Sequence, residues 1–389
     1  MKVAILTFSK TTNYGAALQC YALSSFIQNA GHEVIIFNAP LDSEEAINVS
    51  LIRLICRKVK KTLKKIILSN KQSNSEFVRY SRSEKEKKED IYWDKQVRLL
   101  FESFNQTYLP PFTKELKNEQ DFKEQYPQAD LYIVGSDQVW NLSITQSQKK
   151  IFFFSFLKDE ARISYAASFG GSTQWSGTPK ETQEINQLLK KFKGISVREN
   201  SGISILHDIF HLNGVEVLDP TLLLSSIEYD KLAEKSNLEA SQDLYAYKFI
   251  INDIWLETLK FISEETESKL RMDCETIQLP NVPFNPALSI EGWLKLIKTA
   301  KFVVTDSFHC TVFCILFKKQ FIVSPSYSGG EGRMLSFLKK LGLEDRFYYT
   351  TKDIRKNAKA WKTPIDYDKV YQKLNYHKEQ SRKYLMSYL

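Results

Sequence analysis

The segment VVTDSFHCTVFCILFKK, residues 303–319, places a histidine where an apolar strand is expected to pass into an apolar helix. His309 is one of only five histidines and follows the expected strand end by two residues. In open parallel α/β sheets, ligands bind at the carboxyl ends of the strands. Imidazole titrates near neutral pH, so His309 could give or take a proton there, with Asp306 close in sequence to tune it. A hydrogen-bonded core histidine is the alternative.

A cationic residue stands at another expected strand end. In ISVRENSGISIL, residues 195–206, Arg198 closes a strand directly before a helix that begins near Asn200 or Ser201. A guanidinium beside a helix N-terminus is a good binding site for phosphate or carboxylate. A salt bridge from Arg198 to Glu199 or to another neighbour is the alternative.

Two further strand ends carry groups that suit a ligand rich in hydroxyls. The first strand runs into SKTTNYGAAL, where Asn13, Tyr14 and Gly15 open a helix and the glycine allows close approach to the backbone. The segment IVGSDQVWN adds Ser136, Asp137, Gln138, Trp140 and Asn141. Polar groups can fix sugar hydroxyls while an indole stacks on a sugar face. A tight turn beside a buried tryptophan is the alternative.

Two other motifs have weaker chemical content. In GGEGRMLSFLKKLGLEDR, residues 329–346, glycines precede Arg333, which could close over an anion or serve as a surface or capping residue. In LDPTLLL, Asp219 and Pro220 end a strand, and we expect a mainly structural role because proline stops further pairing. No set of ligands with metal-binding spacing is present, so no metal site is predicted.

The elements that position these residues alternate between strand and helix. Apolar strands are expected at 2–8, 33–38, 130–136, 162–168, 194–199 and 215–220, and, after a polar stretch, at 244–250, 274–279, 301–307, 320–325 and 346–350. Such strands, separated by helices, indicate parallel sheets covered on both faces. We therefore predict an α/β protein with two Rossmann-like domains, residues 1–225 and 226–365. A terminal amphipathic helix, 366–389, is expected to pack back across the joint.

A charged insertion of helical character, residues 42–125, interrupts the first domain. Within it, residues 51–90 hold 13 Lys and Arg against 5 Asp and Glu, so the net charge of +8 arises there. Residues 51–68 have the spacing of a basic amphipathic helix, which suits an anionic membrane surface. Packing on the first domain with a solvated basic face is the alternative. Because the excess charge is confined to this segment and no known binding module is present, no nucleic-acid partner is expected.

Composition also indicates the compartment. The apolar stretch near the N-terminus is too short for a signal peptide, and the longest later run, TVFCILF, is too short to cross a bilayer. Five scattered cysteines without a C-x-x-C pair argue against a disulfide framework. We expect a cytoplasmic protein, at the inner face of the membrane if the basic helix docks there.

Taken in order, several motifs resemble those of the polysaccharide pyruvyl transferase family. They are NYGAALQ, VGSDQVWN, SYAASFG, SVRENS, DPTLLL, TDSFHCTVFCI and LGLEDR, between residues 3 and 346. The resemblance implies a fold like that of the GT-B glycosyltransferases, with the site in the cleft between the halves. It also implies transfer of pyruvyl from phosphoenolpyruvate to two sugar hydroxyls as a ketal, in the biosynthesis of a surface polysaccharide such as a bacterial exopolysaccharide.

The resemblance also assigns roles to individual residues. Arg198 matches the family's donor-binding arginine, and His309 matches the histidine of its end-of-strand motif. By residue type, His309 could supply a proton to the donor's methylene carbon. Arg198 and the helix start at 200–202, with Asn200 and Ser201, would hold the departing charge. Phosphoenolpyruvate would be a co-substrate, and no cofactor or metal is required.

One departure from the family pattern affects the donor. Ser307 stands where many members have arginine, so donor binding would lean on Arg333 or on a lysine, or the donor would differ. The acceptor would be a glycan or a lipid-linked sugar, held by the residues after strands 2–8 and 130–136. A GT-B glycosyltransferase that uses a nucleotide sugar and a catalytically inactive glycan-binding relative are the alternatives.

Overall fold

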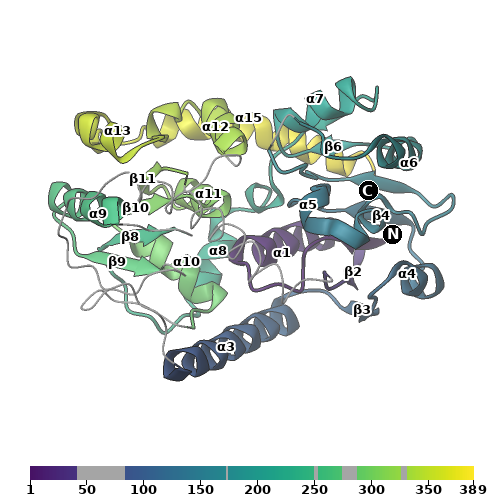
Figure 1. Ribbon diagram of the computed structural model, residues 1–389, viewed down its shortest axis with the longest axis horizontal. Helices are drawn as coiled ribbons and strands as arrows, with labels where there is room; N and C mark the ends of the chain where they lie inside the picture. The colour runs from purple at the N-terminus through teal and green to yellow at the C-terminus, as the bar shows by residue number, and fades with distance from the viewer. Residues whose placement is uncertain (42–83, 172–173, 249–252, 274–286, 326–330) are drawn as a thin grey trace.

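The computed structural model describes residues 1–41, 84–171, 174–248, 253–273, 287–325 and 331–389. The strand expected at 274–279 and the basic helix expected at 51–68 lie outside these residues. Two parallel sheets, each covered by helices, occupy the two halves of the molecule (Figure 1).

The first sheet forms around apolar strands whose side chains are buried on both faces. Its members are β1 (Lys2–Leu6), β2 (Glu33–Asn38), β3 (Phe112–Glu115), β4 (Leu131–Val134) and β5 (Arg162–Ser164). All pair in parallel in the order β3-β2-β1-β4-β5. Parallel bridges extend the arrangement to β6 (Ser196–Val197), which pairs with β7 (Val215–Glu216). Strand order reverses between β1 and β4, which is where open sheets bind their ligands.

The second sheet has the same construction. It consists of β8 (Leu244–Tyr247), β9 (Leu270–Asp273), β10 (Phe302–Thr305) and β11 (Gln320–Val323), all parallel in the order β11-β10-β8-β9. Its order reverses between β8 and β10. The carboxyl ends of these two strands are therefore the expected binding edge of the second half.

Two predicted elements differ from the structure. The insertion was expected to be helical, but its residues 112–115 form β3 at the edge of the first sheet. The prolines at 110–111 end the preceding helix, and the carbonyl of Pro111 accepts a hydrogen bond from Ile36 N at 3.0 Å, which starts the strand pairing. The strand expected at 346–350 is reduced to one parallel bridge between Val323 and Phe347.

Helices connect the strands and cover the sheets. In the first half they are α1 (Tyr14–Asn29), α3 (Glu84–Tyr108), α4 (Glu119–Gln125), α5 (Leu142–Thr145), α6 (Pro179–Leu189) and α7 (Asn200–Asp208). A 3-10 turn, η3 (Pro220–Leu222), then leads to α8 (Ser226–Ala233), α9 (Asp253–Glu265), α10 (Ile290–Thr299), α11 (Phe308–Leu316), α12 (Glu331–Leu341), α13 (Thr351–Lys356), α14 (Ala358–Lys362) and α15 (Tyr367–Met386).

A hydrophobic cluster joins the two halves. It combines buried side chains of α1 and α3 with those of α8, α10 and α11. Within it, the rings of Tyr14 and Trp293 stack with centroids 5.1 Å apart, and the Tyr14 hydroxyl donates to the carbonyl of Leu288 at 2.9 Å. This shared core fixes the loop after β1 relative to the turn after β10.

The terminal helix α15 lies across both halves (Figure 1). Near its start, the Tyr371 hydroxyl donates to the carbonyl of Leu316 in the second half at 3.0 Å. Near its end, Ser381 accepts from the backbone of Leu218, and the Tyr384 hydroxyl donates to the carbonyl of Ser164. Over the part of the chain that is described, no helix is long and apolar enough to cross a bilayer.

Candidate functional site

In the turn that carries His309, two side-chain hydroxyls accept hydrogen bonds from nearby backbone N–H groups. β10 ends at Thr305, whose hydroxyl accepts from Ser307 N at 3.0 Å. Ser307 is the N-cap of α11, and its hydroxyl accepts from Cys310 N at 3.3 Å. His309 is thereby held in the first turn of α11, at the carboxyl end of β10, as the sequence predicted.

The imidazole of His309 rests on the first turn of α1, in the other half of the molecule. A Cβ atom added to Gly15 would lie 2.0 Å from His309 Nδ1. The start of α1 is itself set by Asn13, whose side chain accepts from Ala16 N at 3.0 Å. Only a glycine at position 15 leaves room for the ring, so the binding edges of the two sheets meet at this contact.

A buried carboxylate faces the other ring nitrogen. His309 Nε2 lies 3.4 Å from Asp219 Oδ2, and it has no geometrically sound hydrogen-bond partner among the described residues, so the contact is electrostatic. Asp219 accepts from Ser136 Oγ at 2.9 Å and from Thr221 Oγ1 at 2.6 Å. Asp306 was expected to tune His309. Instead its Oδ2 lies 3.6 Å from Lys248 Nζ, and Asp219 takes the predicted place.

Arg198 is enclosed by carboxylates. Its Nη1 donates to Asp219 Oδ2 at 2.9 Å, its Nη2 lies 3.6 Å from Asp137 and its Nε lies 3.7 Å from Glu199. The Phe308 ring covers the guanidinium, with its centroid 4.7 Å from Cζ. The side chain is only 2% exposed. The salt-bridge alternative therefore describes this conformation, and little of the guanidinium surface is open to a donor phosphate.

Charge in this cluster is set by the partners rather than by burial. Burial alone would raise the pKa of Asp219, but His309, Arg198 and the Thr221 hydrogen bond outweigh it and hold that pKa well below its usual range. Burial would likewise lower the pKa of Arg198, but three carboxylates, Asp219 foremost, raise it. Asp219 is therefore held as an anion and Arg198 as a cation at neutral pH.

Several predicted sugar-binding side chains are used within the fold. Trp140 is fully buried, stacks on Phe153 and donates its indole N–H to the carbonyl of Phe152, so its ring is not open to a sugar. Tyr14 lies in the contact between the halves, and Asn13 caps α1. Trp140 therefore follows the alternative given for this segment, a buried tryptophan beside a tight turn.

Other predicted acceptor residues do lie together at the carboxyl end of β4. Asn141 Nδ2 donates to Gln138 Oε1 at 2.9 Å, and both side chains contact Gly170, which follows β5. Asp137 has a φ of 76°, a strained value for a residue other than glycine, and reaches Arg198. Arg198 thus joins this loop to the His309 cluster, which consists of His309, Asp219, Arg198, Glu199 and Phe308.

The predicted donor side combines a helix start with an arginine from the second half. α7 begins at Asn200 without a side-chain cap, and Ser201 Oγ is buried with no hydrogen-bond partner in the described ranges. α12 packs against α7, and the stem of Arg333 lies against Gly171. Arg333 therefore approaches the first half at Gly171, with α12 packed on α7.

The sequence missed three members of the cluster. Asp219 was expected to be structural, Glu199 was considered only as a salt-bridge partner, and Phe308 was passed over. The signal for Asp219 was its place at a strand end, the same signal that identified Arg198 and His309.

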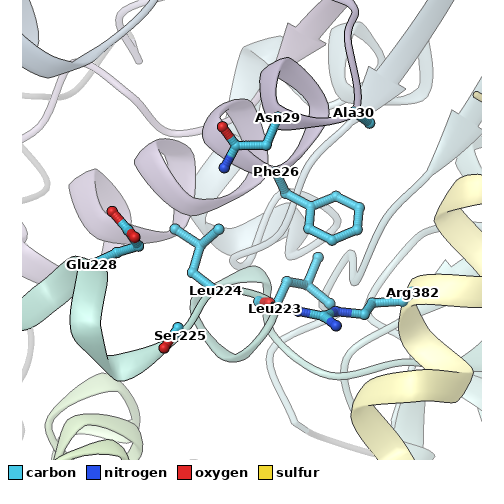
Figure 2. Close-up of a pocket in the computed structure, with 8 residues that line it drawn as sticks. All are labelled: Phe26, Asn29, Ala30, Leu223, Leu224, Ser225, Glu228 and Arg382. Atoms are coloured by element: carbon cyan, nitrogen blue, oxygen red, sulfur yellow. Dashed lines mark hydrogen bonds between the residues drawn. The ribbon is translucent and has the colours of Figure 1, made fainter.

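A separate cavity of about 350 Å³ lies at the opposite end of α1 (Figure 2). Phe26 and Asn29 of α1, Leu223 and Leu224, and Arg382 of α15 contribute to its wall. Since α1 has 16 residues, its ends are roughly 20 Å apart at 1.5 Å per residue. The cavity is therefore distinct from the His309 cluster at the helix start.

The fold is of the GT-B type, with two Rossmann-like domains. It is similar to that of UDP-N-acetylglucosamine 2-epimerase from Rickettsia bellii, with a TM-score of 0.51 at 11% identity over 100% of this chain and 96% of that one. The UDP-GlcNAc 2-epimerase from Methanocaldococcus jannaschii gives a TM-score of 0.50 at 10% identity, over 94% and 93% of the two chains. At such identities the likeness shows the fold alone.

A family model for polysaccharide pyruvyl transferase matches residues 13–326. The chain belongs to the polysaccharide pyruvyl transferase family. The matched range includes every residue of the His309 cluster. No curated protein matches the chain in sequence.

Proposed function

We propose that this protein transfers a pyruvyl group from phosphoenolpyruvate to two hydroxyls of one sugar, forming a cyclic ketal on a polysaccharide or its precursor. The observation that carries the proposal is the contact between His309 and the Asp219–Arg198 pair. An imidazole lies there beside a buried carboxylate, at the meeting point of the binding edges of two sheets. Family membership supports phosphoenolpyruvate as the donor, and His309 is a group that could start the reaction.

His309 is the proposed proton donor. The imidazolium gives its proton to the methylene carbon of phosphoenolpyruvate, which leaves an oxocarbenium-like centre at C2. The first sugar hydroxyl attacks C2 and returns a proton to the imidazole. Phosphate then departs with the proton of the second hydroxyl as that oxygen closes the ring. The Asp219 carboxylate stabilises the imidazolium form, because it stays ionised within 3.4 Å of Nε2.

The donor phosphate is proposed to lie between the start of α7 and Arg333. Free backbone N–H groups at a helix start favour an anion, and Ser201 Oγ offers an unused donor there. Arg198 then acts by positioning the Asp219 and Asp137 carboxylates rather than by binding phosphate. In this arrangement, Arg333 of the second half supplies the cationic contact to the phosphate. The N-terminus of α7, in the first half, supplies the positive end of a helix dipole.

The acceptor sugar is proposed to lie over the loop after β4. Asp137, Gln138 and Asn141 are partly exposed and lie at the carboxyl end of this strand. A carboxylate and two amides can orient a vicinal or 1,3-related pair of hydroxyls.

The experiment that tests the proposal supplies phosphoenolpyruvate with nucleotide-linked, lipid-linked and polymeric sugars. The expected result is one phosphate released per ketal formed, with the ketal detected by the NMR signals of its new methyl group and quaternary carbon. His309→Ala should lower the rate of both by about 10²–10⁴-fold, the usual contribution of a general acid, and His377→Ala, on α15, should leave both unchanged. Transfer of a glycosyl group from a nucleotide sugar, without phosphoenolpyruvate, would overturn the proposal.

A further inference from the structure

A buried lysine lies at the binding edge of the second sheet, outside the cluster described above. Lys248 follows β8, and its side chain is fully buried. Its Nζ donates to the carbonyl of Ser324, directly after β11, at 2.6 Å. It also lies 3.6 Å from Oδ2 of Asp306, directly after β10. One ammonium therefore joins the carboxyl ends of three adjacent strands, at the point where strand order reverses.

Burying these two charges is unfavourable unless they are paired with each other. The Asp306 side chain is 2% exposed, and transferring an ammonium or a carboxylate from water to the protein interior carries a large desolvation penalty. The indole of Trp255, on α9, also contacts the ammonium, with Lys248 Nζ 4.1 Å from the ring centroid. Such a pair fixes geometry more than it adds stability.

The geometry that this pair fixes is the turn before His309. Asp306 is the first residue after β10, and Ser307, Phe308 and His309 follow it into α11. Phe308 covers Arg198, and His309 faces Asp219. A rotation of Asp306 would therefore displace both contacts with the first half.

We infer that Lys248 is a positioning residue, which holds Asp306 and thereby sets the orientation of the His309 imidazole. The role in turnover rests on the proposed function, in which His309 delivers the proton. The orientation of the ring does not rest on it and can be measured separately. Without the Lys248 ammonium, the buried Asp306 carboxylate loses this ion pair, and we expect the turn that follows it to shift.

The first test reads the imidazole directly by NMR. Spectra of 15N-labelled histidine side chains are recorded for the wild type, Lys248→Met and a control, Lys319→Met. Lys319, which is partly buried, likewise donates to a backbone carbonyl, that of Lys298 at 3.0 Å, but it precedes β11 and so lies at the amino ends of the strands. The His309 signals, assigned with His309→Ala, should move in Lys248→Met and stay in place in Lys319→Met.

The four other histidines report whether the fold survives. If Lys248→Met collapses all five sets of signals, Asp306→Asn is measured in its place, since it weakens the same contact while keeping a similar volume. Unmoved His309 signals in a folded variant of either kind would overturn the inference, whether or not the protein uses phosphoenolpyruvate.

The second test separates positioning from donor binding. A 1 Å misplacement of a reacting group costs about 10²-fold in rate, so Lys248→Met should lower kcat about 100-fold with little change in the KM for phosphoenolpyruvate. In the His309→Ala background the same change should have almost no further effect on kcat. An equal loss in both backgrounds, or a rise in KM alone, would contradict a role through His309.

Discussion

Gly15 and His309 touch across the two halves of the molecule, so closely that a methyl group at position 15 would fall 2.0 Å from the imidazole. Gly15→Ala should displace the ring and lower the rate of pyruvyl transfer by at least 10²-fold, because reacting groups tolerate little misplacement. The change is measured as kcat for phosphate release, with the circular dichroism spectrum unchanged.

The other end of the same helix provides a control for Gly15→Ala. Gly31 has a φ of 88°, and an added Cβ there meets no atom of the described residues within 4 Å. Gly31→Ala should cost about 1 kcal/mol of stability through backbone strain and leave kcat unchanged. Equal activity in the two variants would show that the Gly15–His309 contact is not needed.

Asp219 should dominate the acid dependence of stability. Its folded-state pKa is held below the unfolded value, so the unfolded state binds more protons and stability rises with pH across that window. The contribution is complete above the unfolded pKa of about 3.9 and is lost as pH falls below it.

Asp219→Asn should therefore lower the free energy of unfolding at pH 7 by about 3 kcal/mol, since it leaves Arg198 buried without its closest anion. It should also flatten the loss of stability below about pH 4. Urea unfolding at several pH values measures both effects. Asp208→Asn, at an exposed pair with His207, is the control and should change little. If Asp219→Asn lost stability below pH 4 as steeply as the wild type, Asp219 would not be the group that sets the acid dependence.

Tyr14 should act on stability rather than on acceptor binding. Tyr14→Phe removes the hydrogen bond to Leu288 while keeping the stack on Trp293, so the free energy of unfolding should fall by about 1 kcal/mol. The KM for the acceptor should not change. Tyr376→Phe, at an exposed tyrosine, is the matched control. A large rise in acceptor KM would restore Tyr14 to the binding site.

The sequence predicted the fold well because its strands are short apolar runs that end in recognisable polar residues. Arg198 and His309 could be found in the same way, since each stands directly at such an end. Partners were harder to predict. His309 meets Asp219 from another domain rather than Asp306 from its own turn, and this pairing depends on how the two sheets pack.

Some side chains were assigned the wrong role because their neighbours in the sequence suggested one, whereas their contacts in the fold are with residues elsewhere in the chain. Because Pro220 follows Asp219, that motif was interpreted as the structural end of a strand, and the contact of the carboxylate with Arg198 was not predicted. Trp140 looked suited to a sugar because its loop is polar, yet Phe152 and Phe153, more than ten positions away, bury it. Lys248 lies within the apolar run predicted as a strand, so nothing in the sequence marked it as the end of that strand.

The most direct test of the central claim is a thermal unfolding measurement with phosphoenolpyruvate, inorganic phosphate and UDP-N-acetylglucosamine in parallel. A ligand at about 100 times its Kd adds roughly 2.7 kcal/mol of stability, which is a clear shift in Tm. We predict a shift with phosphoenolpyruvate that exceeds the shift with phosphate and is reduced in Arg333→Ala. Stabilisation by the nucleotide sugar alone would contradict it.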